Sequence, residues 1–204
     1  MNEKQVIAYP VMEHFYTLQG EGQYTGCASY FVRLGGCDVG CTWCDVKESW
    51  DMKTHPLMDV EKITELIKHS GTKISVITGG EPTLHPLEAL TSAIKSLGVR
   101  THIETSGTNS LTGNWDWVCF SPKRFKKHLE EYYTHSNELK MVIAHKNDLR
   151  WALELASKMN PQCKLYIQPE WENRAELEPL CIDFIKQHPN WTLSIQTHKY
   201  LGIE

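Results

Sequence analysis

Three of the chain's seven cysteines lie within the stretch GGCDVGCTWCD, residues 35–45. Cys37, Cys41 and Cys44 have the spacing C-x₃-C-x₂-C, and the glycines around them allow one short loop to present three thiolates together. Iron–sulfur clusters are held by cysteine thiolates, and three of them leave one iron of a [4Fe–4S] cluster open to another ligand. A structural zinc site needs four ligands and would have to recruit a distant histidine or Cys27. The spacing therefore favours a [4Fe–4S] cluster, with zinc as the alternative.

The overall composition is that of an ordinary globular protein. The 204 residues carry a formal net charge of −4, which predicts no broad footprint for nucleic acid or for anionic membranes. No apolar run approaches the ~20 residues of a membrane-spanning helix, and the polar start MNEKQ is unlike a signal peptide. We therefore expect a cytoplasmic protein with reduced thiols and a single domain over residues 1–204.

Short apolar runs alternate with amphipathic segments along the chain. The pattern predicts helices over 60–70 with Asp59 as N-cap, over 87–97 before Gly98, over 148–159, and over 174–188, where Pro179 kinks or divides the helix. Strands are predicted at 28–34, which is the first, and at 73–79, 99–105, 115–120, 139–144, 164–168 and 191–196. This alternation predicts an α/β fold of parallel βα units, whose chemistry gathers at the carboxyl ends of the strands.

Two motifs in this order resemble the radical S-adenosylmethionine (SAM) superfamily. The first is the cysteine motif with Trp43 before the last cysteine, and the second is ITGGEP (77–82) after the next predicted strand. The resemblance implies a partial, trimmed radical SAM-type βα barrel, in which the open iron chelates SAM. It also implies that no side chain is the catalyst itself, because a 5′-deoxyadenosyl radical generated at the cluster takes the substrate hydrogen.

Further stretches are similar to the 7-carboxy-7-deazaguanine synthase family. They are FYTLQGEGQYTG (15–26), VRLGGC (32–37), FSPK (120–123) and QTHKYLGIE (196–204), which distribute the resemblance over the whole chain. It implies ring contraction of 6-carboxy-5,6,7,8-tetrahydropterin to 7-carboxy-7-deazaguanine with loss of ammonia, a step toward queuosine and other deazapurines used in tRNA modification. A flavodoxin- or ferredoxin-type electron donor and a homodimer are also implied.

The resemblance assigns roles residue by residue. The implied SAM contacts are Trp43, Cys44, Asp45, Gly79, Gly80, Glu81, Ser106, Ser121, Pro122, Lys123 and Gln168. The implied substrate contacts are Leu18, Gln19, Gly20, Glu21, Arg33, Thr78, His198 and the terminal residue Glu204. Arg33 would bind the pterin carboxylate, a task that suits a guanidinium fork. Taken alone, Glu21 and Glu81 also fit ordinary solvated carboxylates, and Ser106 fits a plain turn serine.

One position departs from the family pattern. Members that depend on Mg²⁺ are expected to have Asp-Thr after the last cysteine, whereas this chain has Asp45-Val46. Valine has no oxygen to offer a cation that prefers oxygen ligands. Mg²⁺ therefore either binds through Asp45, substrate oxygens and water, or is not needed.

Three other functions compete with this interpretation. An activating enzyme for a glycyl-radical protein shares the cysteine motif, but LQGEG, Arg33 and the QTHK ending argue against it. A non-enzymatic [4Fe–4S] redox or sensor module would not need TGGEP. A zinc-stabilised nucleic-acid-binding module is disfavoured by the acidic balance and by the lack of a second ligand pair.

Overall fold

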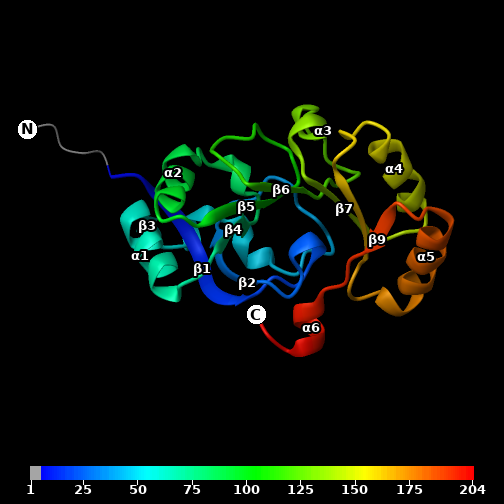
Figure 1. Cartoon of the computed structure of the whole chain (residues 1–204), viewed down its shortest axis with the longest axis horizontal. Helices are drawn as coiled ribbons and strands as arrows, with labels where there is room; N and C mark the ends of the chain where they lie inside the picture. The colour runs from blue at the N-terminus through cyan, green and yellow to red at the C-terminus, as the bar shows by residue number, and fades with distance from the viewer. Residues whose placement is uncertain (1–5) are drawn as a thin grey trace, which may run out of the picture.

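A single twisted sheet forms the centre of the computed structural model, which describes residues 6–204 (Figure 1). The MNEKQ segment lies outside the described residues. The strands follow the order β3-β1-β2-β4-β5-β6-β7-β8-β9. Their bounds are Ala8–Leu18 (β1), Ala28–Leu34 (β2), Leu57–Asp59 (β3), Ile74–Gly79 (β4), Arg100–Thr105 (β5), Trp117–Phe120 (β6), Glu138–Ile143 (β7), Lys164–Pro169 (β8) and Trp191–Leu193 (β9). Each pair from β2-β4 to β8-β9 is parallel, so the predicted parallel, unclosed α/β architecture is confirmed.

Helices connect these strands. They are Val60–Ser70 (α1), Glu88–Ser96 (α2), Glu131–His135 (α3), Asn147–Ala156 (α4), Arg174–Gln187 (α5) and Thr197–Leu201 (α6). Helices α1 and α2 lie together at one end of the molecule, and α4 and α5 lie at the other (Figure 1). Asp59 caps α1 as predicted, because its carboxylate accepts a 2.6 Å hydrogen bond from the Lys62 amide. Helix α5 runs unbroken through Pro179. None of the helices among residues 6–204 is long and apolar enough to cross a membrane.

The first strand is β1, so the prediction that the first strand lies at 28–34 is wrong. Strand β1 pairs antiparallel with β2 on one side and with β3 on the other, and Pro10 lies inside it. Proline lacks an amide proton and is therefore a poor strand signal. The predicted strand at 191–196 is also too long, because β9 ends at Leu193. Helices α3 and α6 are short elements without a full apolar stripe, and the sequence pattern does not predict them.

The two faces of the sheet have different tasks. Five parallel strands each place an almost fully buried residue in the core, namely Val32, Ile77, Ile103, Leu139 and Ile167. Successive side chains on a strand point to opposite faces, so the next residue on each strand points away from this core. Those next residues are Arg33, Thr78, Glu104, Lys140 and Gln168. The core packing thus forces a row of polar side chains onto the inner face of the sheet.

Candidate functional site

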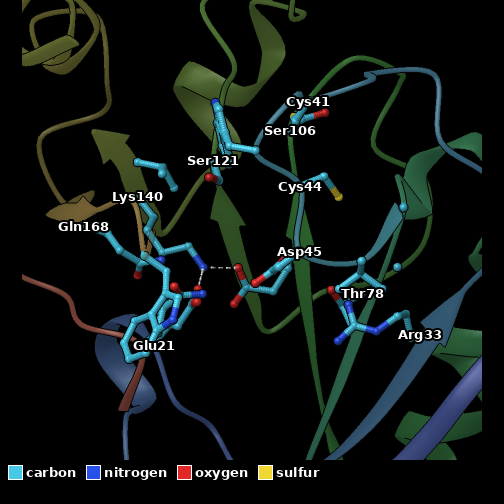
Figure 2. A pocket seen from close by; sticks show the side chains of 18 of the residues that line it. Glu21, Arg33, Cys41, Cys44, Asp45, Thr78, Ser106, Ser121, Lys140 and Gln168 are labelled. Atoms are coloured by element: carbon cyan, nitrogen blue, oxygen red, sulfur yellow. Dashed lines mark hydrogen bonds and ion pairs between the residues drawn. The ribbon is translucent and has the colours of Figure 1, made fainter. Parts of the chain in front are cut away.

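A cavity of about 510 Å³ lies on this inner face and receives the polar row from the strands. Figure 2 shows side chains from β2, β4, β7 and β8 pointing into it together with the cysteine loop. Every residue that the sequence assigns to the site lines this cavity except Pro122. Pro122 is buried between Ser121 and Lys123, which both line the cavity. The structure thus brings together residues that are as far apart in the chain as Leu18 and Glu204.

The cysteine loop follows β2 directly and forms one wall of the cavity. Cys41 is 8% exposed, and Cys37 and Cys44 are partly buried. Burial raises the pKa of the Cys37 thiol, and burial together with the two neighbouring cysteines raises that of Cys41 to about 11. All three are free thiols on one short loop that lines the cavity, and thiolates are the ligands that soft metals prefer.

The glycines of TGGEP are required by the backbone that they touch. A Cβ on Gly80 would lie 2.4 Å from the Gly36 carbonyl oxygen and 2.6 Å from the Cys37 Cβ. The turn after β4 therefore packs directly against the start of the cysteine loop, and only glycine fits there. Backbone hydrogen bonds fix the contact, from the Gly80 amide to Leu34 at 3.1 Å and from the Glu81 amide to Gly36 at 2.8 Å.

Glu81 is a buried organiser of this wall. Its carboxylate is 1% exposed and accepts hydrogen bonds from the Thr83 and Thr105 hydroxyls, each at 2.6 Å. It also accepts from the Ser106 amide at 2.8 Å and from the Ser106 hydroxyl. Both carboxylate oxygens are thus used inside the protein, which leaves the backbone of this turn to contact a ligand. The side chain joins the loop after β4 to the loop after β5.

The loop after β6 completes the cysteine side of the cavity. The Lys123 ammonium donates to the Ser121 carbonyl at 2.6 Å and to the Ser121 hydroxyl at 2.8 Å. It also lies 5.5 Å from the ring centre of Trp43, within range of a cation–π interaction. Burial lowers the pKa of Lys123. Trp43, Ser121 and Lys123 therefore form one contiguous surface beside Cys44.

The opposite wall is a network of buried charges. Lys140 is 5% exposed and forms ion pairs with Glu21 and, at 2.7 Å, with Glu104. Burial acts to lower the pKa of Lys140, but the carboxylates around it raise the pKa well above its ordinary value. Burial acts to raise the pKa of Glu21, but Lys140 lowers it to about 2. Gln19 donates to the other Glu104 oxygen at 3.3 Å. Three charges are thus held in place before any ligand binds.

Glu138 lies behind this network on the same strand as Lys140. It accepts hydrogen bonds from the Gln23 amide at 3.1 Å and from the Trp117 indole at 3.2 Å. Burial, followed by repulsion from Glu104, raises the pKa of Glu138 to about 7. Glu21, Glu104 and Lys140 therefore face the cavity, while the carboxyl behind them keeps a proton more readily than an ordinary glutamate.

Arg33 and Thr78 lie side by side on β2 and β4, where they are register partners (Figure 2). The Arg33 Nε donates to Glu13 of β1 at 2.6 Å, and the arginine side chain is largely buried. This ion pair uses one edge of the guanidinium and fixes its plane. The other edge is available to a planar anion in the cavity, next to the Thr78 hydroxyl.

The C-terminal segment closes the cavity rim. His198 packs so tightly on Gly20 that a Cβ on this glycine would lie 2.1 Å from the His198 Nδ1. The Thr17 hydroxyl of β1 donates to the Glu204 main-chain oxygen at 3.1 Å. Lys199 donates to the Asp45 carboxylate at 2.7 Å, which joins α6 to the cysteine loop. Burial lowers the pKa of His198. The C-terminal segment thus meets the end of β1 and the residues that follow it at one rim.

Comparison with known proteins decides the family. The radical SAM superfamily model matches residues 31–132. A 7-carboxy-7-deazaguanine synthase from Flavobacterium psychrophilum is 47% identical, with 95% of this chain and 92% of that protein covered. One from Synechocystis is 43% identical, with 100% and 97% covered. The crystal structure of QueE from Escherichia coli superposes with a TM-score of 0.84 at 32% identity, over 94% of this chain and 95% of the other.

The chain belongs to the 7-carboxy-7-deazaguanine synthase family. Both resemblances in the sequence, to this family and to the radical SAM superfamily, are thereby confirmed. The superfamily implies a [4Fe–4S] cluster and SAM. The cysteine wall fits such a cluster, because three unpaired thiols line one cavity beside a turn that only glycine can form. Among residues 6–204, no group of three or more Cys, His, Asp or Glu side chains is placed to hold a single metal ion.

The remaining cysteines lie apart from this wall. Cys119 and Cys181 are buried in the core, and Cys27 is exposed and does not line the cavity. A Mg²⁺ site beside the cysteines fits poorly, because Asp45 is already paired with Lys199 and Val46 offers no side-chain oxygen. The free thiols of the cysteine loop thus fit the family's cluster, whereas the side chains around Asp45 offer few oxygen ligands to a divalent cation.

Several cavity residues are absent from the predicted site. Glu104, Lys140, Lys199 and Trp171 line the cavity, and the Arg174 guanidinium stacks 4.0 Å above the Trp171 ring. Lys140 has a signal in the sequence, since it is the one charged residue of the otherwise apolar run LKMVIA. Glu104 lies one residue before the end of the predicted strand 99–105 and two residues before Ser106, which the sequence does assign to the site.

Proposed function

We propose that this chain is a 7-carboxy-7-deazaguanine synthase, which converts 6-carboxy-5,6,7,8-tetrahydropterin to 7-carboxy-7-deazaguanine with release of ammonia. One observation carries the proposal beyond family membership. A single cavity has three free thiols on one wall and an arginine with a carboxylate–lysine network on the other. The first wall suits a radical-generating cofactor, and the second suits a ligand with both a carboxylate and several N–H donors.

The substrate side matches the chemistry of the pterin. We assign the free edge of Arg33 and the Thr78 hydroxyl to its carboxylate, because a guanidinium fork can bind a carboxylate through two hydrogen bonds. We assign Glu21, Glu104 and the Glu204 end of the chain to its guanidine-like edge, since carboxylates are acceptors for N–H groups. Lys140 acts as a positioning residue, because its ion pairs hold both glutamates in place.

The cofactor side supplies the radical chemistry. Cys37, Cys41 and Cys44 would hold the cluster, and when bound the cluster and SAM supply the radical that removes one substrate hydrogen atom and later returns it. The backbone of Gly79 and Gly80, the Ser106 hydroxyl and the surface formed by Trp43, Ser121 and Lys123 would hold SAM.

Other features of the proposal follow the family resemblance. We include a single domain over residues 1–204, supported by one sheet that runs from β1 to β9 and by one core beneath it. We also include a flavodoxin- or ferredoxin-type electron donor, a homodimer, a cytoplasmic location and a place in queuosine biosynthesis and tRNA modification. For Mg²⁺ we propose that turnover does not require it, because the Lys199 ammonium already provides a positive charge at Asp45.

Anaerobic reconstitution with iron and sulfide, followed by incubation with SAM, dithionite and the carboxypterin, tests the activity. The proposal predicts about four irons per chain and 7-carboxy-7-deazaguanine as the product detected by mass spectrometry. An intact cluster that cleaves SAM without forming deazaguanine would reject the activity and leave the superfamily assignment standing. A glycyl-radical activating enzyme would instead remove a hydrogen atom from an added protein substrate. A redox module would not cleave SAM.

A further inference from the structure

A short basic segment lies on the surface beside the cysteine wall. We call residues 124–127 the basic loop, which reads Arg-Phe-Lys-Lys and follows Lys123 in the connection between β6 and α3 (Figure 1). The Phe125 ring is 58% exposed, and Arg124 and Lys127 are exposed as well. The loop borders a hollow that Tyr133 and Trp151 help to line. Phenylalanine and arginine are both enriched at protein–protein interfaces, and this segment exposes one of each side by side.

Direct contacts join the basic loop to the cysteine loop, next to Cys37. The Lys126 ammonium donates to the carbonyl of Asp38 and lies 3.4 Å from its carboxylate. Asp38 is the residue after Cys37, and the Thr108 hydroxyl donates to its carboxylate at 3.2 Å from the loop after β5. At the other end, Lys123 lies against Trp43 inside the cavity. The loop therefore bridges the protein surface and the cysteine wall within a few residues.

The charges of the loop are only partly balanced by the protein. Arg124 lies 3.8 Å from Asp148, a long contact for an ion pair, and its side chain is about half exposed. Lys127 forms no ion pair with any residue between 6 and 204. Glu130 is the acidic residue among those that line the neighbouring hollow. The loop thus presents positive charge on a chain whose net charge is −4.

We propose that the basic loop is the docking surface for the electron donor, a small carrier protein with an acidic face around its redox group. The inference rests on the proposed function, because only a chain that holds the cluster needs this electron. One electron leaves the reduced carrier, which is oxidised by one electron, and the same electron reduces the cluster by one. No atom is transferred. Arg124 and Lys127 attract the acidic face, and Phe125 packs against it.

A protein partner fits this surface better than a nucleic acid. The basic loop is a compact patch of three cations around one aromatic ring, whereas phosphate-tracking surfaces extend basic residues along a groove. Its position also suits electron transfer, since the loop contacts Asp38, the residue after Cys37. A nucleic acid bound here could not supply an electron to the cluster.

Binding and reduction by a purified flavodoxin and by a purified [2Fe–2S] ferredoxin test the proposal on the reconstituted holoenzyme. The variant Arg124→Glu/Lys127→Glu reverses the two exposed charges and leaves Lys123 and Lys126 in place. The matched control is Lys62→Glu/Lys68→Glu on the exposed face of α1, which makes the same change in net charge at the far end of the molecule. Calorimetry at low salt gives the affinities, and stopped-flow spectroscopy gives the rate of cluster reduction.

We expect the loop variant to bind at least one of the two carriers about tenfold more weakly and to be reduced by it about tenfold more slowly, while the control stays near wild type. Reduction by dithionite and the SAM cleavage that it drives should not change. Equal losses in loop variant and control, no loss in the loop variant, or no binding of either carrier to wild type would each overturn the proposal. So would loop-dependent binding of a transfer RNA without binding of a carrier. Failure of deazaguanine formation with dithionite concerns the proposed function and leaves the docking result readable.

Discussion

The two walls of the cavity are built on opposite principles. On the substrate wall each charge has a protein partner, since Lys140 pairs with Glu21 and Glu104, and Arg33 pairs with Glu13. On the cysteine wall the three thiols are free, and burial raises the pKa of Cys37 and Cys41. The substrate wall is therefore preorganised by the chain, whereas the cysteine wall acquires its function from a metal cluster.

Because of this contrast, we expect substitutions on the two walls to have different effects, on the stability of the fold in one case and on the loading of the cluster in the other. Changes on the substrate wall should alter the free energy of unfolding, because they leave buried charges unpaired. Changes at the cysteines should alter iron content with little effect on the fold.

Replacing Cys41 with alanine should abolish SAM-dependent activity, because one of three thiolate ligands is lost from the least exposed position. Iron analysis after reconstitution should show loss of the cluster, while circular dichroism should show a native fold. Cys27→Ala is the matched control, since this cysteine is exposed and outside the cavity, and it should keep its iron. Full iron and activity in Cys41→Ala, or loss of iron in Cys27→Ala, would contradict the ligand assignment.

Replacing Lys140 with methionine should lower the free energy of unfolding by about 3 to 5 kcal/mol, because two partly buried carboxylates lose their cation. Urea unfolding at neutral pH measures the change. Lys199→Met removes a more exposed ion pair and should cost at most about 1 kcal/mol. Similar costs for the two variants would show that the network around Lys140 is not a preorganised element.

Ionisation of Glu138 should lower the free energy of unfolding as the pH rises. Its pKa is about 7 in the folded chain, whereas the ordinary value for a glutamate is 4.5, so between these pH values the folded state holds a proton that the unfolded state releases. Relative to Glu138→Gln, wild type should lose about 2 to 3 kcal/mol of unfolding free energy from about pH 5 to about pH 8. Glu154→Gln, on the exposed face of α4, should leave the pH profile unchanged. A parallel profile for wild type and Glu138→Gln would rule out the raised pKa.

Deleting Gly202–Glu204 should weaken the substrate wall at its rim. The Thr17 contact to Glu204 and the predicted contact with the pterin are both lost. We expect about a tenfold rise in KM, equivalent to about 1.4 kcal/mol, with unchanged iron content. Normal kinetics in the truncated protein would exclude a role for this end of the chain.

The smallest effect is expected where the two walls meet, at Asp45. Chelation followed by addition of Mg²⁺ should change turnover less than twofold, because Lys199 pairs with Asp45 and Val46 offers no oxygen. Val46→Thr provides the comparison, since it restores a hydroxyl at this position. Strong stimulation of wild type by Mg²⁺ would show that the cation displaces Lys199.

The sequence predicts the cysteine wall better than the substrate wall, for physical reasons. Cysteine and glycine motifs are local, and the parallel order of β2 and β4 necessarily places Cys37 beside Gly80. The charge network instead depends on which face of each strand points inward. Lys140 lies in an apolar run, and only the packing of Leu139 and Met141 into the core shows that it faces the cavity.

The sequence pattern also does not predict some elements near the ends of the chain. Strand β1 contains Pro10 and pairs antiparallel with both β2 and β3, whereas the alternation of strand and helix predicts parallel strands. Helix α6 has five residues, too few for a periodic signal, although its QTHK motif marks it through the family resemblance. The Lys199 contact to Asp45 joins residues 154 positions apart, and only the folded chain reveals it.

The central claim is that one cavity combines a cluster-loading wall with a separate, preorganised substrate wall. Iron content, dithionite-driven SAM cleavage and deazaguanine formation, measured on the same reconstituted preparations of wild type and Glu104→Gln, test it most directly. The account predicts full iron and SAM cleavage in both proteins, with deazaguanine formation lowered by about tenfold or more in Glu104→Gln, where one charged acceptor is lost. Loss of iron in Glu104→Gln, or undiminished deazaguanine formation, would contradict the separation of the two walls.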